Sequence, residues 1–236
     1  MVQEYDTLLN TYKLMFEMVD IFHFNSQNTR DVYERYLPIP KKSAVVTITH
    51  NGVKDYREVR TFDDKILKLG FVGSEAPYKG LPILKRVIAR INAEGFADRL
   101  HLSVYGGRTG KDEALKNVEY KGRFTSSLIE SVYCSMDLLV VPSLCCETFS
   151  LTTIEALQFG VPVLVSSKVG AKDIVNQYAP QFVFETAEDL YQTLKRLMMN
   201  RTELVRYNAD VVNTPWPWSM KQHAKDIEQV IYRGNE

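Results

Sequence analysis

Two glutamates close together in the sequence are the side chains whose type and spacing first suggest a site. Glu147 and Glu155 are separated by seven residues, on either side of the point where a loop is expected to become a helix. A helix that begins at the carboxyl end of a parallel strand presents free N–H groups and the positive end of its dipole, and both favour an anion. Carboxylates repel a phosphate but accept hydrogen bonds from hydroxyl groups. The pattern therefore predicts a ligand that carries both phosphates and a polyol.

The segments around these glutamates predict the unit that positions them. Leu138–Val141 is an apolar run that ends at a proline, which is typical of a fully buried strand. A helical period over 150–159 and a second apolar run at Val161–Val165 follow, and Thr148 and Ser150 are the candidate N-caps of the helix. Strand, loop, helix and strand within about thirty residues form a βαβ unit with a right-handed crossover.

The same alternation extends over most of the chain. Strands are expected at residues 44–49, 66–72, 100–105, 138–141, 161–165 and 182–184, and helices at 81–94, 125–135, 172–177, 185–200, 201–212 and 219–233. The helix at 125–135 is expected to be capped by Thr125. Buried strands that alternate with helices of about ten to fifteen residues are typical of βαβ units. The predicted fold class is therefore α/β, a doubly wound Rossmann-like parallel sheet.

Three loops of this fold are expected at the carboxyl ends of strands, where such sheets bind ligands. They are Gly73–Gly80, Gly106–Gly110 and Ser143–Ser150. Lys79 lies in the first loop and can reach a phosphate as a point charge, although a loop lysine is more often simply solvated. Combined with the two glutamates, it favours a site. The chain has neither G-x-x-x-x-G-K-[ST] nor a G-x-G-x-x-G that opens a helix, so the P-loop and dinucleotide signatures are missing.

Composition excludes several other classes of protein. Lys+Arg and Asp+Glu both number 29, so no general attraction to nucleic acid is expected. Three cysteines cannot build a disulfide framework and indicate a reducing compartment. No metal site is predicted, because the four histidines are scattered and no Asp-x-Asp occurs. No apolar run has the length of a membrane span, so a cytoplasmic protein is expected, with peripheral membrane contact left open.

The stretch PSLCCETFSLTTIEALQFGVPV, at residues 142–163, carries a resemblance to a known family. It is similar to P-S-x-x-E-x-F-G-x-x-x-x-E-A-x-x-x-G-x-P-V in the C-terminal domain of retaining GT-B glycosyltransferases of family 4, the "glycosyl transferases group 1". The resemblance is extended by NGV at 51–53, KG at 79–80 and VGAKDIV at 169–175, and it runs from about residue 25 to the end.

The resemblance implies a donor site for a UDP- or GDP-sugar that requires no cofactor and no metal. Lys79 would hold the diphosphate together with backbone N–H groups at the start of the helix. The residues implied on the nucleotide side are Ser74, Lys79, Thr148, Phe149, Ser150 and Leu151.

The same resemblance assigns the two carboxylates and the base. Glu155 would bind the ribose hydroxyls, and Glu147 would contact hydroxyls of the donor sugar. The loop that contains Arg123 and Phe124 would lie near the base. Lys79 and Glu147 would be the catalytic pair.

Two departures from the family pattern shape the expected organisation. Ser74 stands where the family commonly has an arginine, and most of the N-terminal acceptor domain is missing. The expected parts are a remnant of that domain with a linker at 1–42, a nucleotide-sugar donor-binding domain at 43–213, and a helix at 214–236 that would dock on the missing domain.

The leading hypothesis is the donor-binding half of a retaining, metal-independent hexosyltransferase. Its acceptor would be a glycan, a polysaccharide or a lipid-linked molecule, reached in the cytoplasm or at the inner face of the membrane. The acceptor domain would be supplied in cis or in trans, so the chain alone is expected to be incomplete or inactive as an enzyme. The alternative is a non-catalytic nucleotide-sugar-binding or assembly module.

Overall fold

The structure, a computed structural model, describes residues 2–37, 43–46, 55–216 and 219–233. The region expected to form a Rossmann-like domain contains a seven-stranded sheet with the order β5-β6-β4-β3-β7-β8-β9. Every pairing in it is parallel except that of β5 with β6. Its strands are β3 (Leu67–Val72), β4 (Leu100–Tyr105), β5 (Thr109–Lys111), β6 (Val118–Gly122), β7 (Leu138–Val141), β8 (Val163–Ser166) and β9 (Val183–Phe184).

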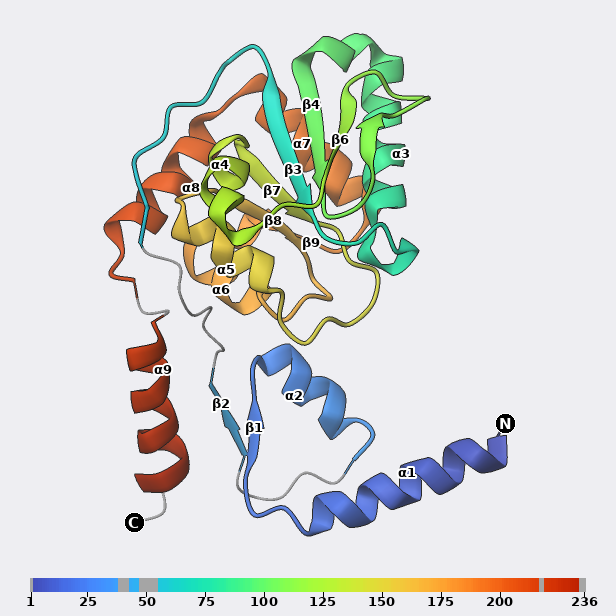
Figure 1. Cartoon of the computed structure of the whole chain (residues 1–236), viewed down its shortest axis with the longest axis vertical. Helices are drawn as coiled ribbons and strands as arrows, with labels where there is room; N and C mark the ends of the chain where they lie inside the picture. The colour runs from blue at the N-terminus through green and yellow to red at the C-terminus, as the bar shows by residue number, and fades with distance from the viewer. Residues whose placement is uncertain (1, 38–42, 47–54, 217–218, 234–236) are drawn as a thin grey trace.

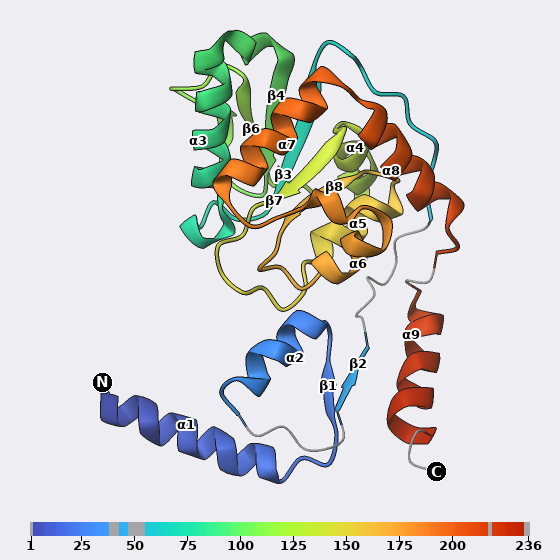
Figure 2. The ribbon, with the colours of Figure 1, turned by 180° about the vertical axis from the view of Figure 1, so that it is seen from behind.

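Helices cover both faces of this sheet, as the predicted fold class requires. Figure 1 shows α4 (Ile129–Cys134) and α5 (Leu151–Gln158) in front of the sheet, and Figure 2 shows α7 (Ala187–Met199) crossing the opposite face beside α3 (Leu81–Ile91). The remaining helices of this region are α6 (Lys172–Tyr178) and α8 (Thr202–Asn213). The central strands β7 and β8 are buried along their whole length, because a parallel sheet with helices on both faces has no solvent side.

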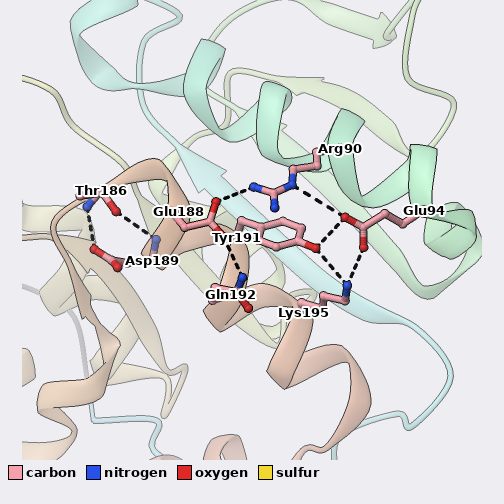
Figure 3. A network of polar contacts seen from close by, with 8 residues as sticks. All are labelled: Arg90, Glu94, Thr186, Glu188, Asp189, Tyr191, Gln192 and Lys195. Carbon is pink, nitrogen blue, oxygen red and sulfur yellow. Dashed lines mark hydrogen bonds and ion pairs between the residues drawn. The ribbon is translucent and has the colours of Figure 1, made fainter.

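A polar network ties α3 to α7 at the surface (Figure 3). Arg90 of α3 lies over the ring of Tyr191 at 3.6 Å and places Nη1 2.5 Å from Oε2 of Glu188. Glu94 accepts a hydrogen bond from the Tyr191 hydroxyl at 2.6 Å and pairs with Lys195 Nζ at 2.6 Å. These hydrogen bonds hold the pKa of Glu94 below its usual value. The network fixes the two helices on the face away from α5.

The N-terminal segment forms a separate small layer. It contains α1 (Val2–Glu17), β1 (Phe22–Phe24), α2 (Gln27–Glu34) and β2 (Ser43–Val45), and β1 and β2 make a two-stranded parallel sheet. The C-terminal helix α9 (Met220–Ile227) continues into a π-helical turn at Glu228–Arg233. Figure 1 shows β1, β2 and α9 below the large sheet. No helix in the described part of the chain is long and apolar enough to cross a bilayer.

Two local expectations were wrong. The strand expected from residue 44 does not join the large sheet: β2 pairs with β1 in a separate two-stranded sheet. Thr125 makes no side-chain cap. The chain after it starts as a 3-10 turn, Ser126–Leu128, and the Thr125 hydroxyl lies 2.8 Å from the Ser127 hydroxyl. Residues 47–53, which include the NGV motif, lie outside the described residues.

Candidate functional site

A cavity of about 330 Å³ lies where β3 and β7 end at their carboxyl edges. This is the place at which a doubly wound sheet binds ligands. Its walls come from the ends of β3 and β7, from the two loops that follow these strands and from the first turn of α5. The lining residues are Phe71, Val72, Gly73, Ser74, Lys79, Val140, Val141, Pro142, Ser143, Glu147, Ser150, Leu151 and Thr152.

Lys79 and Glu147 meet in this cavity. The Lys79 Nζ lies 2.9 Å from Glu147 Oε1, and the Ser143 hydroxyl donates to the same carboxylate oxygen. The Glu147 side chain is 13% exposed and that of Lys79 is 32% exposed, so the ion pair is only partly screened by water. A cation and a carboxylate side by side can serve a phosphate and a hydroxyl group of one ligand.

Gly80 explains how Lys79 reaches this position. Its φ of +82° belongs to the left-handed region, and a Cβ added to it would lie 1.7 Å from the carbonyl oxygen of Pro142. Only glycine therefore permits the 3-10 turn Pro77–Lys79 to pack against the end of β7. That contact brings the lysine to the loop that carries Glu147.

The N-terminus of α5 faces this site with its backbone groups free of side-chain caps. The expectation that Thr148 or Ser150 caps the helix was wrong: Ser150 is the N-cap residue, but its side chain makes no capping bond. Its hydroxyl instead lies 3.0 Å from the Thr152 hydroxyl. In the described part of the chain, the N–H groups of Phe149 and Ser150 have no hydrogen-bond acceptor. These N–H groups can bind an anion.

Ser150 is also a backbone exception. Its φ of +104° makes it the one non-glycine residue with a positive φ among the described residues. Such a conformation costs on the order of 1–3 kcal/mol and is concentrated at functional sites. The family pattern that the chain resembles has glycine here, and the positive φ that glycine would favour is kept although serine occupies the position.

Glu155 lies half-buried in α5 but not in the cavity lining. The hydroxyl of the buried Tyr133 donates to Glu155 Oε2 at 2.5 Å. Burial first, and then the Glu155 charge, raise the pKa of Tyr133 well above its usual value. The phenol is therefore a permanent donor that orients the carboxylate.

The other residues implied by the resemblance lie around the cavity rather than in it. Arg123 is exposed, and Phe124 packs edge-on against Tyr105 with ring centroids 5.9 Å apart. Phe149 is buried, whereas Thr148 is exposed toward a second cavity. The structure thus brings together Ser74, Lys79, Glu147, Ser150 and Leu151. The roles of all the residues implied by the resemblance stay predictions.

Sequence reasoning missed two contributors to the site. Ser143, which donates to Glu147, is the second residue after β7, and that position was the available signal. The α2 residues that bind the Thr148 carbonyl were not foreseen, because nothing in a local pattern links residues more than a hundred positions apart. Among the described residues, no three His, Cys, Asp or Glu side chains gather as metal ligands would.

Comparison with known proteins assigns the chain to a family. Residues 67–200, more than half of the chain, match the family described as Glycosyl transferases group 1. The chain is 33% identical over 110 residues to a GDP-mannose-dependent alpha-mannosyltransferase of Mycolicibacterium smegmatis. That alignment covers 45% of this chain and 27% of the mannosyltransferase, so the chain matches about a quarter of that protein.

Solved structures share the fold at low sequence identity. Sucrose-phosphate synthase from Thermosynechococcus elongatus has a TM-score of 0.72 and 19% identity, over 98% of this chain and 62% of that one. Anabaena HepE in complex with UDP and glucose has a TM-score of 0.71 and 15% identity, over 98% of this chain and 67% of that one. The chain therefore spans less than two thirds of the synthase. It belongs to the glycosyl transferases group 1 family and has the fold of the C-terminal half of a GT-B glycosyltransferase.

Proposed function

We propose that this chain is the donor-binding half of a retaining glycosyltransferase. It binds a nucleoside diphosphate sugar in the cavity between β3, β7 and α5. The observation that carries the proposal is the Lys79–Glu147 ion pair at 2.9 Å, within a cavity bounded by the N-terminus of a helix. The match of residues 67–200 to the glycosyltransferase family supports the same reading.

The diphosphate is held by positive charge and backbone N–H groups. Lys79 supplies a cation at the mouth of the cavity, and the N–H groups of Phe149, Ser150 and Leu151 supply oriented donors. Lys79 is paired with Glu147. Donor binding therefore exchanges one anionic partner of Lys79 for another, and Ser143 continues to donate to the carboxylate.

The sugar and the nucleoside are assigned to the remaining polar groups. Glu147 accepts hydrogen bonds from hydroxyl groups of the donor sugar, and Glu155 accepts them from the ribose while Tyr133 holds it in place. The loop of Arg123 and Phe124 lies near the base. GDP-mannose in the name of one relative and UDP in the HepE complex leave guanine and uracil as the two bases to test.

The same groups supply the catalytic contribution of this half. When the bond from sugar to diphosphate breaks, negative charge grows on the departing phosphate oxygens. A fixed lysine and fixed N–H donors stabilise that charge without reorganising, which is the largest contribution in most enzymes. No metal or other cofactor is required in this proposal, so transfer is expected to continue in EDTA.

The acceptor wall of the cleft is supplied by another domain, in cis or in trans. Large apolar side chains on one face of α1 are exposed, among them Tyr5, Leu8 and Tyr12. In a longer protein another domain would cover this face. The length of the synthase agrees with this idea, because the chain spans only 62% of it. The acceptor is a glycan, a polysaccharide or a lipid-linked molecule, and the protein works in the cytoplasm or at the inner face of the membrane.

One observation favours a second function. Ser74, rather than a cation, lines the cavity five residues before Lys79. A site with one lysine would bind the diphosphate more weakly than a site with two cations, so a non-catalytic nucleotide-sugar-binding or assembly module is the alternative. Donor hydrolysis or transfer that is lost in Lys79→Ala and Glu147→Ala would eliminate it.

A thermal-shift screen of UDP, GDP and their sugars in EDTA tests the proposal. A ligand that binds only the folded chain stabilises it by about 2.7 kcal/mol at a hundred times its Kd. We expect this stabilisation with the diphosphates of one base. An unchanged melting temperature with all of them would overturn the proposed function.

A further inference from the structure

The loop that carries Glu147 is held from two sides. On one side the backbone of 168–171 binds it: Glu147 N–H donates to the Lys168 carbonyl at 3.1 Å, and Ala171 N–H donates to the Phe149 carbonyl at 2.9 Å. Between these bonds, the Thr148 carbonyl points the other way, toward the N-terminal segment. This carbonyl is the contact point between the donor loop and α2.

Two hydroxyl groups, one from the N-cap residue of α2 and one from its first turn, hold the Thr148 carbonyl. Ser26 Oγ donates to it at 2.6 Å, and Thr29 Oγ1 lies 2.8 Å from it. A hydroxyl has a single proton, so Thr29 donates to one of three acceptors in reach: the Thr148 carbonyl, Oδ1 of Asn25 at 3.0 Å or Oγ of Ser26 at 2.9 Å. Ser26 is 2% exposed and Thr29 is 9% exposed, so water competes little for these bonds.

The surroundings leave the loop little freedom. A Cβ at Gly170 would lie 2.1 Å from the Thr148 carbonyl oxygen and 2.4 Å from Ser26 Oγ, so only glycine allows this approach. Asn28 Nδ2 also lies 3.2 Å from the Lys168 carbonyl oxygen, and Gln27 N–H donates to Asp173 Oδ2 at 2.9 Å. The whole N-terminus of α2 is thus fastened to the edge of the donor site.

The planarity of the peptide bond links the contact at the Thr148 carbonyl to the site. In a planar trans peptide the carbonyl and the following N–H point in opposite directions. When Ser26 and Thr29 hold the Thr148 carbonyl, the Phe149 N–H must therefore point away from α2. That N–H has no acceptor among the described residues, and the next residue, Ser150, lines the cavity.

We infer that Ser26 and Thr29 are positioning residues for donor binding. By holding the Thr148 carbonyl they fix the Phe149 N–H in the direction from which it meets the diphosphate. The inference rests on the proposed function. It makes the N-terminal segment part of the donor site, because the orientation of a phosphate-binding group depends on two side chains outside the large sheet.

The test combines calorimetry with amide NMR on the full chain, using UDP and GDP as probes. The variant S26A/T29V removes both hydroxyls, T29V alone leaves the cap of α2 intact, and T29S keeps the hydroxyl. Because Ser26 also caps α2 by accepting from Thr29 N–H, the matched control is S219A, which removes the N-cap of the equally long α9.

We expect S26A/T29V to bind the diphosphate about tenfold more weakly, the loss of roughly one hydrogen bond to a charged group. T29V should show a smaller loss of the same kind, while T29S and S219A keep the original affinity. The Phe149 amide proton should shift downfield when nucleotide saturates the unsubstituted protein, and by less than half as much in S26A/T29V.

An unchanged Kd in S26A/T29V, or a Phe149 amide that does not respond to nucleotide in the unsubstituted protein, would overturn the inference and leave the proposed function standing. If the unsubstituted protein binds neither UDP nor GDP, both the proposed function and the inference fail.

Discussion

Lys79 and Glu147 come from loops that follow two adjacent strands, β3 and β7, and the lysine Nζ lies 2.9 Å from the carboxylate of the glutamate. Since the Ser143 hydroxyl donates to the same carboxylate oxygen, the glutamate keeps one partner when the lysine turns to a ligand. In the proposed donor site Lys79 meets the diphosphate and Glu147 meets the sugar, so the two members of the pair can be tested separately.

Replacing Lys79 by alanine should weaken nucleoside diphosphate binding by about ten- to a hundredfold, the range expected for a hydrogen bond between charged groups. Lys79→Arg should keep part of the affinity, because it keeps the charge. Lys111→Ala, which removes an exposed lysine of β5, is the matched control. Calorimetric titration measures all three, and equal affinity in Lys79→Ala and the control would contradict the role of Lys79.

Replacing Glu147 by glutamine should weaken the binding of the nucleotide sugar but not that of the free diphosphate. The neutral side chain no longer competes for Lys79, so free UDP or GDP should bind as tightly as before or more tightly. The sugar hydroxyls lose a charged acceptor, so the nucleotide sugar should lose about tenfold in affinity. The ratio of the two dissociation constants is the readout, and parallel changes in both would argue against sugar recognition by Glu147.

The assignment of Glu155 to the ribose predicts a loss of discrimination between ribose and deoxyribose. The unsubstituted protein should bind UDP or GDP more tightly than the 2′-deoxy form, and Glu155→Ala should bind both almost equally. Tyr133→Phe, which removes the 2.5 Å donor to this carboxylate, should give an intermediate result. Competition titrations with the deoxynucleotides measure the ratio; full discrimination in Glu155→Ala would place the ribose elsewhere.

The pH dependence of stability should carry a contribution from Asp112. Burial opposes its ionisation, but hydrogen bonds from Lys85, Tyr120 and two backbone N–H groups hold its pKa below the usual value. A lowered folded pKa means that this contribution is complete above the ordinary aspartate pKa and is lost as the pH falls through the lower, folded value.

Asp112→Asn should therefore be destabilised by about 1–3 kcal/mol at pH 7 and should lose less stability than the unsubstituted protein when acidified. The side chain is 3% exposed, so little solvent screening reduces this effect. Urea unfolding at pH 7 and near pH 3 measures the difference, with the exposed Asp98→Asn as control. An acid dependence in Asp112→Asn as steep as that of the unsubstituted protein would contradict the assignment.

The sequence predicted the central sheet well because buried parallel strands are nearly continuous apolar runs. The expected bounds of β4 and β7 agree with the structure, and those of β3 differ by one residue. The short strand β5 was missed. Its residues, Thr109–Lys111, are all exposed, so they show no alternation of apolar and polar positions.

The position of the site could be predicted because the ends of the strands could be predicted. Because the loops after β3 and β7 must lie side by side in such a sheet, Lys79 and Glu147 could be expected to meet. The positive φ of Ser150 and the direction of the Thr148 carbonyl could not, since both depend on contacts with distant segments. Local patterns report propensity and burial, but they do not report which way one peptide faces.

Calorimetric titration of UDP, GDP, UDP-glucose and GDP-mannose into the full chain in EDTA, repeated with Lys79→Ala, decides whether this cavity binds a donor. We expect one-to-one binding of the diphosphate and the sugar nucleotide of one base, without metal, and at least a tenfold loss of affinity in Lys79→Ala. No binding of any of the four ligands, or binding that Lys79→Ala leaves unchanged, would contradict the claim that this cavity is a donor site.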